Sequence, residues 1–149
     1  MIQIGVIGAG SCDDALRITA EEVGAEIAKS NAILLCGGHG GVMEASASGA
    51  KREGGTTIGI LPGESRISAN AYIDIAIVTD MGHARNVIIA RSADVLIAVG
   101  GEYGTLSEIA HSLKMGKTVI TLESKWEIDG TVKAKSPKDA VMMAINSIK

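Results

Sequence analysis

Short runs of apolar residues alternate along this chain with longer stretches in which apolar residues recur at helical spacing. Six apolar runs are present, at Ile2–Ile7, Ala32–Cys36, Thr57–Leu61, Ile73–Val78, Val95–Val99 and Thr118–Leu122. The run Val95–Val99 (VLIAV) has no polar face, as expected of a strand that is covered on both sides in a parallel sheet. The alternation predicts an α/β fold, namely a Rossmann-like, doubly wound domain with a mainly parallel sheet.

Helical patterns fill most of the gaps between these runs. Five helices are predicted. The first begins near Asp13, the second covers Val42–Glu53 and the third covers Ala84–Ser92. The fourth runs from Tyr103 to a stop at Gly116, and the fifth runs from Pro137 to the end of the chain. The first helix carries Leu16, Ala20, Val23 and Ile27 on its inner face. Ser136 is the predicted N-cap of the last helix. Two segments, 62–71 and 123–135, have no regular pattern.

Length and composition limit the classes of protein to which the chain can belong. The 149 residues fit one domain with a sizeable core and require no second domain. The net charge is −3, the charges form no long runs, and only three residues are aromatic, so the sequence argues against nucleic acid as a partner. It contains no apolar stretch as long as a membrane span.

The cysteines and histidines follow no metal-binding pattern. Cys12 and Cys36 match no metal or redox spacing, which suits a reducing cytoplasm. The three histidines, His39, His83 and His111, form no sequential set of metal ligands. The amino terminus is expected to form the first strand rather than a signal peptide. We therefore expect a cytoplasmic protein without a metal site.

Clusters of glycine follow three of the predicted strands. They are Gly8 and Gly10 after the first, Gly37, Gly38, Gly40 and Gly41 after the second, and Gly100, Gly101 and Gly104 after the fifth. In a doubly wound sheet these loops share the carboxyl edge, where ligands bind at the reversal of strand order. The helix after Gly104 directs unpaired N–H groups to this edge, and Thr105 adds a hydroxyl in its first turn. The pattern favours a phosphate-bearing ligand over a turn that merely connects two elements.

Arg85 and Glu108 are the candidate chemical groups of this edge. Arg85 opens the helix after the fourth strand, and Glu108 lies early in the helix after the fifth, so both can reach one cleft. A guanidinium binds phosphate or ribose oxygens, and a carboxylate can act as general acid or base or stabilise a developing cation. The alternatives are a surface ion pair for Arg85 and a helix-dipole contact for Glu108.

Two familiar nucleotide-binding motifs are incomplete. Gly8-Ala-Gly10 resembles the start of a dinucleotide fingerprint, but Asp13 occupies its third glycine position and no acidic residue ends the second strand. Met115-Gly-Lys-Thr118 resembles the end of a P-loop, yet the segment runs from helix to strand instead of strand to helix. An ordinary NAD site and a P-loop are both disfavoured.

From Gly5 to about Leu122 the sequence resembles the SLOG superfamily. That superfamily joins the Lonely guy cytokinin-activating phosphoribohydrolases, the "possible lysine decarboxylase" proteins and the molybdenum-cofactor carrier proteins. The phosphoribohydrolase signature PGGxGTxxE, preceded by an arginine, is similar to Gly100–Glu108 with Arg85 upstream, although Gly100 replaces the proline and Glu102 the second glycine. The resemblance implies that Arg85 and Glu108 are the catalytic positions and that Gly101, Gly104 and Thr105 line the phosphate site.

The finer match is to the carrier-like branch. The segments GGHGGVMEA (Gly37–Ala45), GILPG (Gly59–Gly63), ARN (Ala84–Asn86) and GTLSEIA (Gly104–Ala110) are similar to it. The resemblance implies ligand contacts by all the glycines of the three clusters and by Ser11, Met43 and Asn86. His39 stands where a third glycine is common, and Glu102 places an anion in the phosphate turn, where it would repel phosphate unless it points away.

The resemblance leaves two functions open. One is binding of a nucleotide or of a molybdopterin-type cofactor at the glycine loops, and the alternative is a phosphoribohydrolase that cleaves the N-glycosidic bond of a nucleoside 5′-monophosphate. A homodimer or homotetramer is expected from the family and from the high apolar content. A lysine decarboxylase is not supported, because nothing marks Lys114 or Lys117 as a pyridoxal Schiff-base lysine.

Overall fold

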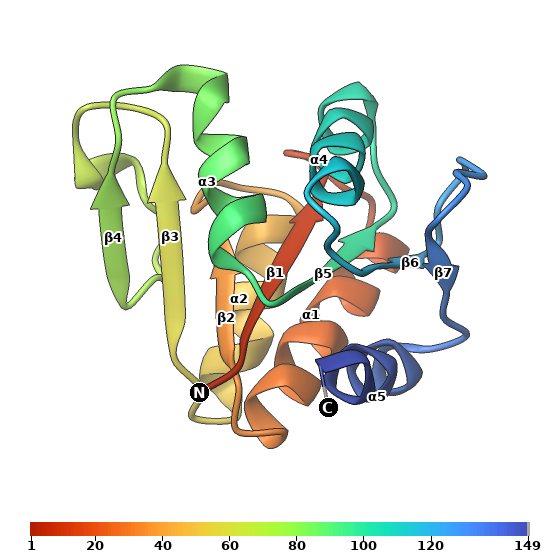
Figure 1. Ribbon diagram of the computed structural model, residues 1–149. Coiled ribbons are helices and arrows are strands. Elements are labelled where there is room, and N and C mark those ends of the chain that lie inside the picture. The colour runs from red at the N-terminus through yellow and green to blue at the C-terminus, as the bar shows by residue number, and fades with distance from the viewer. Residues whose placement is uncertain (149) are drawn as a thin grey trace.

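A sheet of seven parallel strands forms the centre of the computed structural model, which describes residues 1–148 (Figure 1). The strands are β1 (Gln3–Gly8), β2 (Ile33–Cys36), β3 (Thr57–Leu61), β4 (Ile75–Val78), β5 (Val95–Val99), β6 (Val119–Leu122) and β7 (Val132–Lys133). Their order across the sheet is β4-β3-β2-β1-β5-β6-β7. The chain therefore builds outward from β1 to β4 and then returns to place β5 beside β1, so the strand order reverses between β1 and β5.

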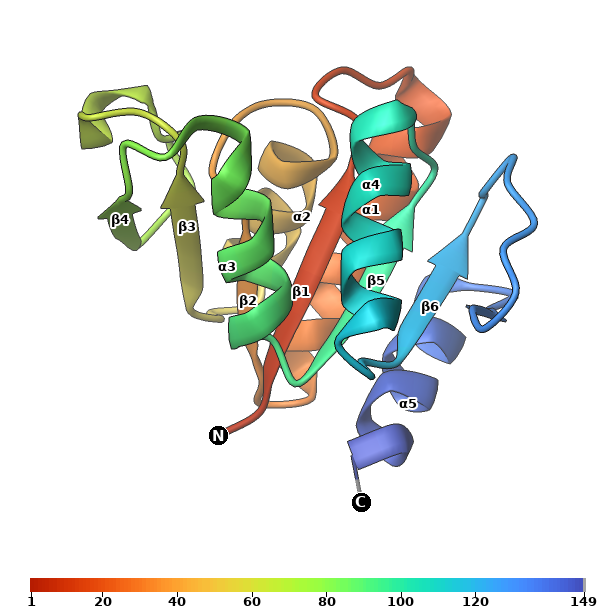
Figure 2. The same ribbon diagram turned by 45° about the horizontal axis from the view of Figure 1, so that its top comes forward.

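Helices cover both faces of the sheet. The helices α1 (Asp14–Lys29), α2 (Val42–Arg52) and α5 (Pro137–Ile148) pack on one face, and α3 (Arg85–Ser92) and α4 (Tyr103–Lys114) on the other (Figure 2). This is the single doubly wound α/β domain that the sequence predicts. Strand β5 is fully buried, as its unbroken apolar run requires.

Three helix ends lie where the sequence predicts them. The Asp13 carboxylate accepts a hydrogen bond of 2.8 Å from the Leu16 N–H, and the Ser136 hydroxyl accepts one of 3.1 Å from the Asp139 N–H. Helix α4 ends at Lys114, and Gly116 follows with a φ of +78°, a left-handed conformation that glycine adopts at little cost. At these three helix ends the local sequence signals agree with the structure.

The edges of the sheet differ from the prediction. The apolar run Ile73–Val78 forms strand only from Ile75. Ile75 and Ile77 are 49% and 45% exposed, because β4 lies at the edge of the sheet and pairs with β3 alone among the described strands. At the other edge, β7 lies within the segment 123–135 that has no sequence pattern. A strand of two residues is too short to produce a period.

Candidate functional site

A cleft opens where the strand order reverses, beyond the carboxyl ends of β1 and β5. Its volume is about 230 Å³. The predicted residues that line it are Gly8, Gly10, Gly37, Met43, Arg85, Asn86, Gly104, Thr105 and Glu108. Further lining residues are Val6, Ile7, Ala9, His83 and Glu102. The structure thus gathers residues from the loops after β1, β2, β4 and β5 at one place, as expected for a doubly wound fold.

Six of the predicted ligand residues lie outside this lining. They are Ser11, Gly38, Gly40, Gly41, Gly100 and Gly101. Ser11 and Gly41 line a second cavity instead. Gly38, Gly100 and Gly101 have φ angles of +79°, +59° and +131°, which L side chains rarely adopt, so they shape the turns around the cleft.

Arg85 is anchored by backbone carbonyls. Its Nη1 donates hydrogen bonds of 2.6 Å to the carbonyl oxygens of Gly37 and Ile60, and its Nε donates one of 2.6 Å to Asn86 Oδ1. A Cβ at Gly37 would lie 2.8 Å from Nη1, so a larger residue there would require the guanidinium to shift. Burial lowers the pKa of Arg85 from its ordinary value, and Glu108 raises it. Arg85 is thus a half-buried cation in the cleft wall, and not half of a surface ion pair.

Glu108 is a partly buried carboxyl in the same cleft. Burial raises its pKa to about 7, against the opposing charge of Arg85. Among the described residues no side chain donates a hydrogen bond to this carboxylate. A carboxyl with such a pKa is suited to take or give a proton near neutral pH.

The turn before α4 carries the second carboxylate of the cleft. Glu102 occupies the N-cap position, but its side chain makes no capping hydrogen bond and is exposed. The first N–H groups of α4 therefore remain without a side-chain cap, and Thr105 is buried beside them. Glu102 lines the cleft, so its charge lies within the field of any anion bound there.

Asn70 is a residue whose importance the sequence did not reveal. Its backbone N–H donates to the Gly38 carbonyl and its Nδ2 donates to the His39 carbonyl, both at 2.8 Å. The irregular segment 62–71 thereby holds the second glycine loop in place. His39 does not line the cleft, and its Nε2 is buried without a hydrogen-bond partner among residues 1–148. Burial lowers the pKa of His39. Loop composition was the only signal at Asn70.

The described residues contain no cluster of three or more side chains that could hold a metal ion. Within the same residues, none of the helices has both the length and the apolar character needed to cross a membrane.

Comparison with known proteins assigns the chain to a family. The model of the SLOG cluster4 family matches residues 1–149, which is the whole chain. The chain belongs to the SLOG cluster4 family. This match confirms the resemblance to the SLOG superfamily that the glycine motifs indicated.

Two solved structures resemble the SLOG chain over nearly its full length. The molybdenum cofactor binding protein from the phototrophic bacterium Rippkaea orientalis superposes with a TM-score of 0.94 at 38% identity, covering 99% of this chain and 98% of that one. The molybdenum cofactor carrier protein from Chlamydomonas reinhardtii superposes with a TM-score of 0.88 at 36% identity, covering 99% and 98%. The sequence identity of both matches is higher than that of proteins that share only a fold.

A partial match connects the chain to an enzyme. The cytokinin riboside 5′-monophosphate phosphoribohydrolase of Mycobacterium tuberculosis is 40% identical over 93 residues, which are 60% of this chain and 50% of the enzyme. The SLOG chain thus spans about half the length of that relative.

Proposed function

We propose that this protein binds a phosphorylated, nucleotide-like ligand in the cleft between β1 and β5, and that the ligand is a molybdopterin-type pterin bound as cargo. The observation that carries the proposal is the likeness over 99% of the chain to two proteins that bind or carry the molybdenum cofactor. The chemistry of the cleft supports it at the phosphate end of such a ligand.

Three groups would hold the phosphate. The uncapped N–H groups at the start of α4 point positive dipole ends at the cleft, and the Thr105 hydroxyl lies beside them. The hydrogen bonds found for Arg85 use Nη1 and Nε, so among the described residues Nη2 is left without a protein partner. A guanidinium held in this way can clamp a phosphate without first losing conformational freedom.

Co-elution of the cargo tests the proposal. Molybdenum cofactor released from a donor enzyme is mixed with the protein, separated by gel filtration and oxidised, and pterin fluorescence is read in the protein fraction. We expect fluorescence with the wild type, and at least a tenfold smaller signal with Arg85→Met because a charged hydrogen-bonding group is lost. Arg91→Met, an exposed arginine on the same helix, is the matched control. Fluorescence confined to the small-molecule fractions with the wild type would refute the proposal.

A second candidate function is hydrolysis of a nucleoside 5′-monophosphate to free base and ribose 5-phosphate. It is favoured by the pKa of about 7 at Glu108 and by the partial match to the phosphoribohydrolase. In this reaction the bond from the ribosyl carbon to the base breaks, water supplies the new oxygen, and the base leaves with a proton. Ionised Glu108 would stabilise the positive charge that develops on the ribosyl centre, and Arg85 would hold the phosphate.

Chromatographic detection of free base from a panel of nucleoside 5′-monophosphates tests this candidate. If the protein is a hydrolase, Glu108→Gln lowers the rate by about a hundredfold or more, because it removes the charge and keeps the size. Turnover that survives the substitution intact would remove Glu108 from the mechanism. An absence of wild-type turnover with every substrate, together with pterin binding, would leave the carrier as the function.

A further inference from the structure

A second cavity lies between the amino-terminal ends of α1 and α2, next to the cleft. Its volume is about 470 Å³, against about 230 Å³ for the cleft. Small-molecule pockets usually measure about 300–1,000 Å³, so the cleft alone is too small for a ligand with both a phosphate and a heterocycle. Gly10 lines both spaces, and a Cβ added there would meet no atom within 4 Å. The two spaces therefore adjoin at Gly10.

The charges of this cavity differ from those of the cleft. Arg17 lines it, but its Nη1 is bound at 2.7 Å to the Glu21 carboxylate in the same wall. Glu44, in the first turn of α2, also lines the cavity and has no hydrogen bond or ion pair among the described residues. The wall is thus left with one unpaired carboxylate, which repels a phosphate and attracts a group rich in N–H donors.

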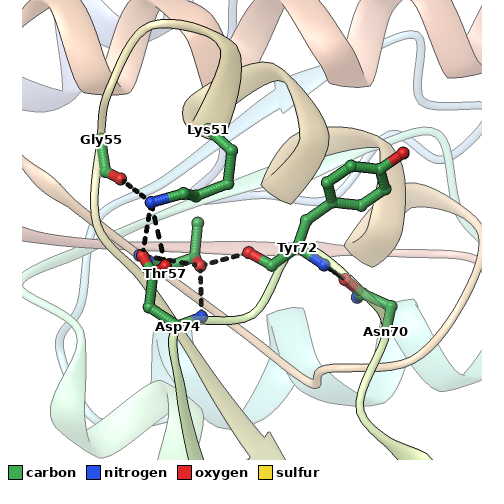
Figure 3. Close-up of polar contacts among 6 residues, drawn as sticks. All are labelled: Lys51, Gly55, Thr57, Asn70, Tyr72 and Asp74. Carbon is green, nitrogen blue, oxygen red and sulfur yellow. Dashed lines mark hydrogen bonds and ion pairs between the residues drawn. The ribbon is translucent and has the colours of Figure 1, made fainter.

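An aromatic ring lines the same cavity. The backbone of Tyr72 is held by the network of Figure 3, in which its N–H donates to Asn70 Oδ1 at 3.0 Å and its carbonyl accepts from the Thr57 hydroxyl. The ring takes no part in this network, and its hydroxyl makes no hydrogen bond there (Figure 3). Tyr72 is 39% exposed and lines the cavity, so its backbone is held in place while its side chain is open to a ligand.

We propose that this cavity binds a 2-amino-4-oxopyrimidine ring, the edge that guanine and pterin share. That edge presents a ring N–H beside an amino group, and a carboxylate accepts both hydrogen bonds at once. Adenine presents an acceptor in place of the ring N–H. Glu44 would accept the two bonds, and the Tyr72 ring would stack on the heterocycle. The inference rests on the proposed function, because it places the phosphate of the same ligand in the cleft.

Binding of unphosphorylated compounds tests the cavity without the cleft. Free pterin, guanosine and adenosine are titrated into the wild type, and binding is measured by pterin fluorescence and by calorimetry. We expect pterin and guanosine to bind at least tenfold more tightly than adenosine, since the unmatched edge would leave polar groups unpaired. Tighter binding of pterin than of guanosine indicates a pterin cargo, and the reverse order indicates a guanine nucleotide.

Two pairs of variants assign the contacts. Glu44→Gln should weaken the binding of pterin and guanosine by roughly ten- to a hundredfold and leave the binding of adenosine unchanged. Glu22→Gln, an exposed carboxylate on α1 outside the cavity, is the control and should change nothing. Tyr72→Ala should weaken the binding of pterin and guanosine by roughly fivefold or more. Tyr72→Phe should leave their binding unchanged, because it keeps the ring and removes only the hydroxyl. Wild-type affinities in Glu44→Gln would overturn the inference.

The cavity inference and the proposed function fail in different ways. If neither pterin nor guanosine binds at millimolar concentration, while ribose 5-phosphate binds and depends on Arg85, the cavity inference is wrong and the cleft proposal stands. If pterin binds and depends on Glu44, but a phosphate on the ligand adds no affinity, the inference stands and phosphate binding in the cleft is refuted. Equal affinity for adenosine and guanosine would also overturn the inference.

Discussion

The partly buried carboxyl of Glu108 should make the stability of this protein fall as the pH rises. Its folded-state pKa is about 7, against an ordinary value of 4.5 that applies to the unfolded chain. Between these values the folded protein holds a proton that the unfolded chain has released, so the free energy of unfolding decreases with rising pH. From pH 5 to pH 8 the loss is about 2.5 kcal/mol, since each pKa unit corresponds to about 1.4 kcal/mol.

Replacing Glu108 with Gln removes this loss, because the amide stays neutral. We expect Glu108→Gln to match the wild type within about 1 kcal/mol at pH 5 and to be more stable by about 2–3 kcal/mol at pH 8. For a chain of this length that corresponds to a Tm higher by roughly 5–10 °C. Urea unfolding at both pH values measures it, and the difference between wild type and variant cancels the titration of independent groups.

The sign of the change at pH 8 separates burial from a helix-dipole role. A carboxylate that merely complements the dipole of α4 stabilises the helix by about 1 kcal/mol or less when ionised, so the variant would then be less stable at pH 8. Glu102→Gln is the control, since Glu102 lines the same cleft but is exposed. Parallel pH profiles for the wild type and Glu108→Gln, or a less stable variant at pH 8, would refute the reasoning.

Two further predictions concern Arg85 and the edge of the sheet. Arg85→Lys should lower the free energy of unfolding by about 1–3 kcal/mol, because one ammonium group cannot replace the guanidinium bonds to Gly37, Ile60 and Asn86 and leaves carbonyls unpaired. Urea unfolding measures this change, and an unchanged midpoint would contradict the prediction. The protein should be at least a dimer, since Ile75 and Ile77 on the edge strand β4 are about half exposed. Light scattering should then give a mass of at least twice the 15.3 kDa of the chain, and a monomeric mass at micromolar concentration would contradict the prediction.

The sequence by itself determined the class of fold, several helix ends and the edge of the sheet at which the cleft lies. Apolar runs alternating with helical patterns suffice for an α/β sheet, because burial on two faces requires an unbroken run such as Val95–Val99. The helix starts at Asp13 and Ser136 could be read because capping is a contact between residues three apart. The glycine clusters predicted the edge at which the cleft lies, since all parallel strands end at the same side of the sheet.

Only the tertiary structure decided what the residues of that edge do. Arg85 bonds to carbonyls 48 and 25 residues away, and these partners follow from how α3 packs over the sheet. The raised pKa of Glu108 depends on how deeply the cleft buries it, which no spacing records. Asn70 and Tyr72 carried no sequence motif, and Glu44 belongs to the segment Gly37–Ala45 but was not among the predicted ligand residues. Glu44 and Tyr72 became candidates because the fold brings the start of α2 and the loop before β4 to one cavity. Asn70 did so because it bonds to the second glycine loop. Local patterns fix local structure, whereas a site is made of contacts between distant segments.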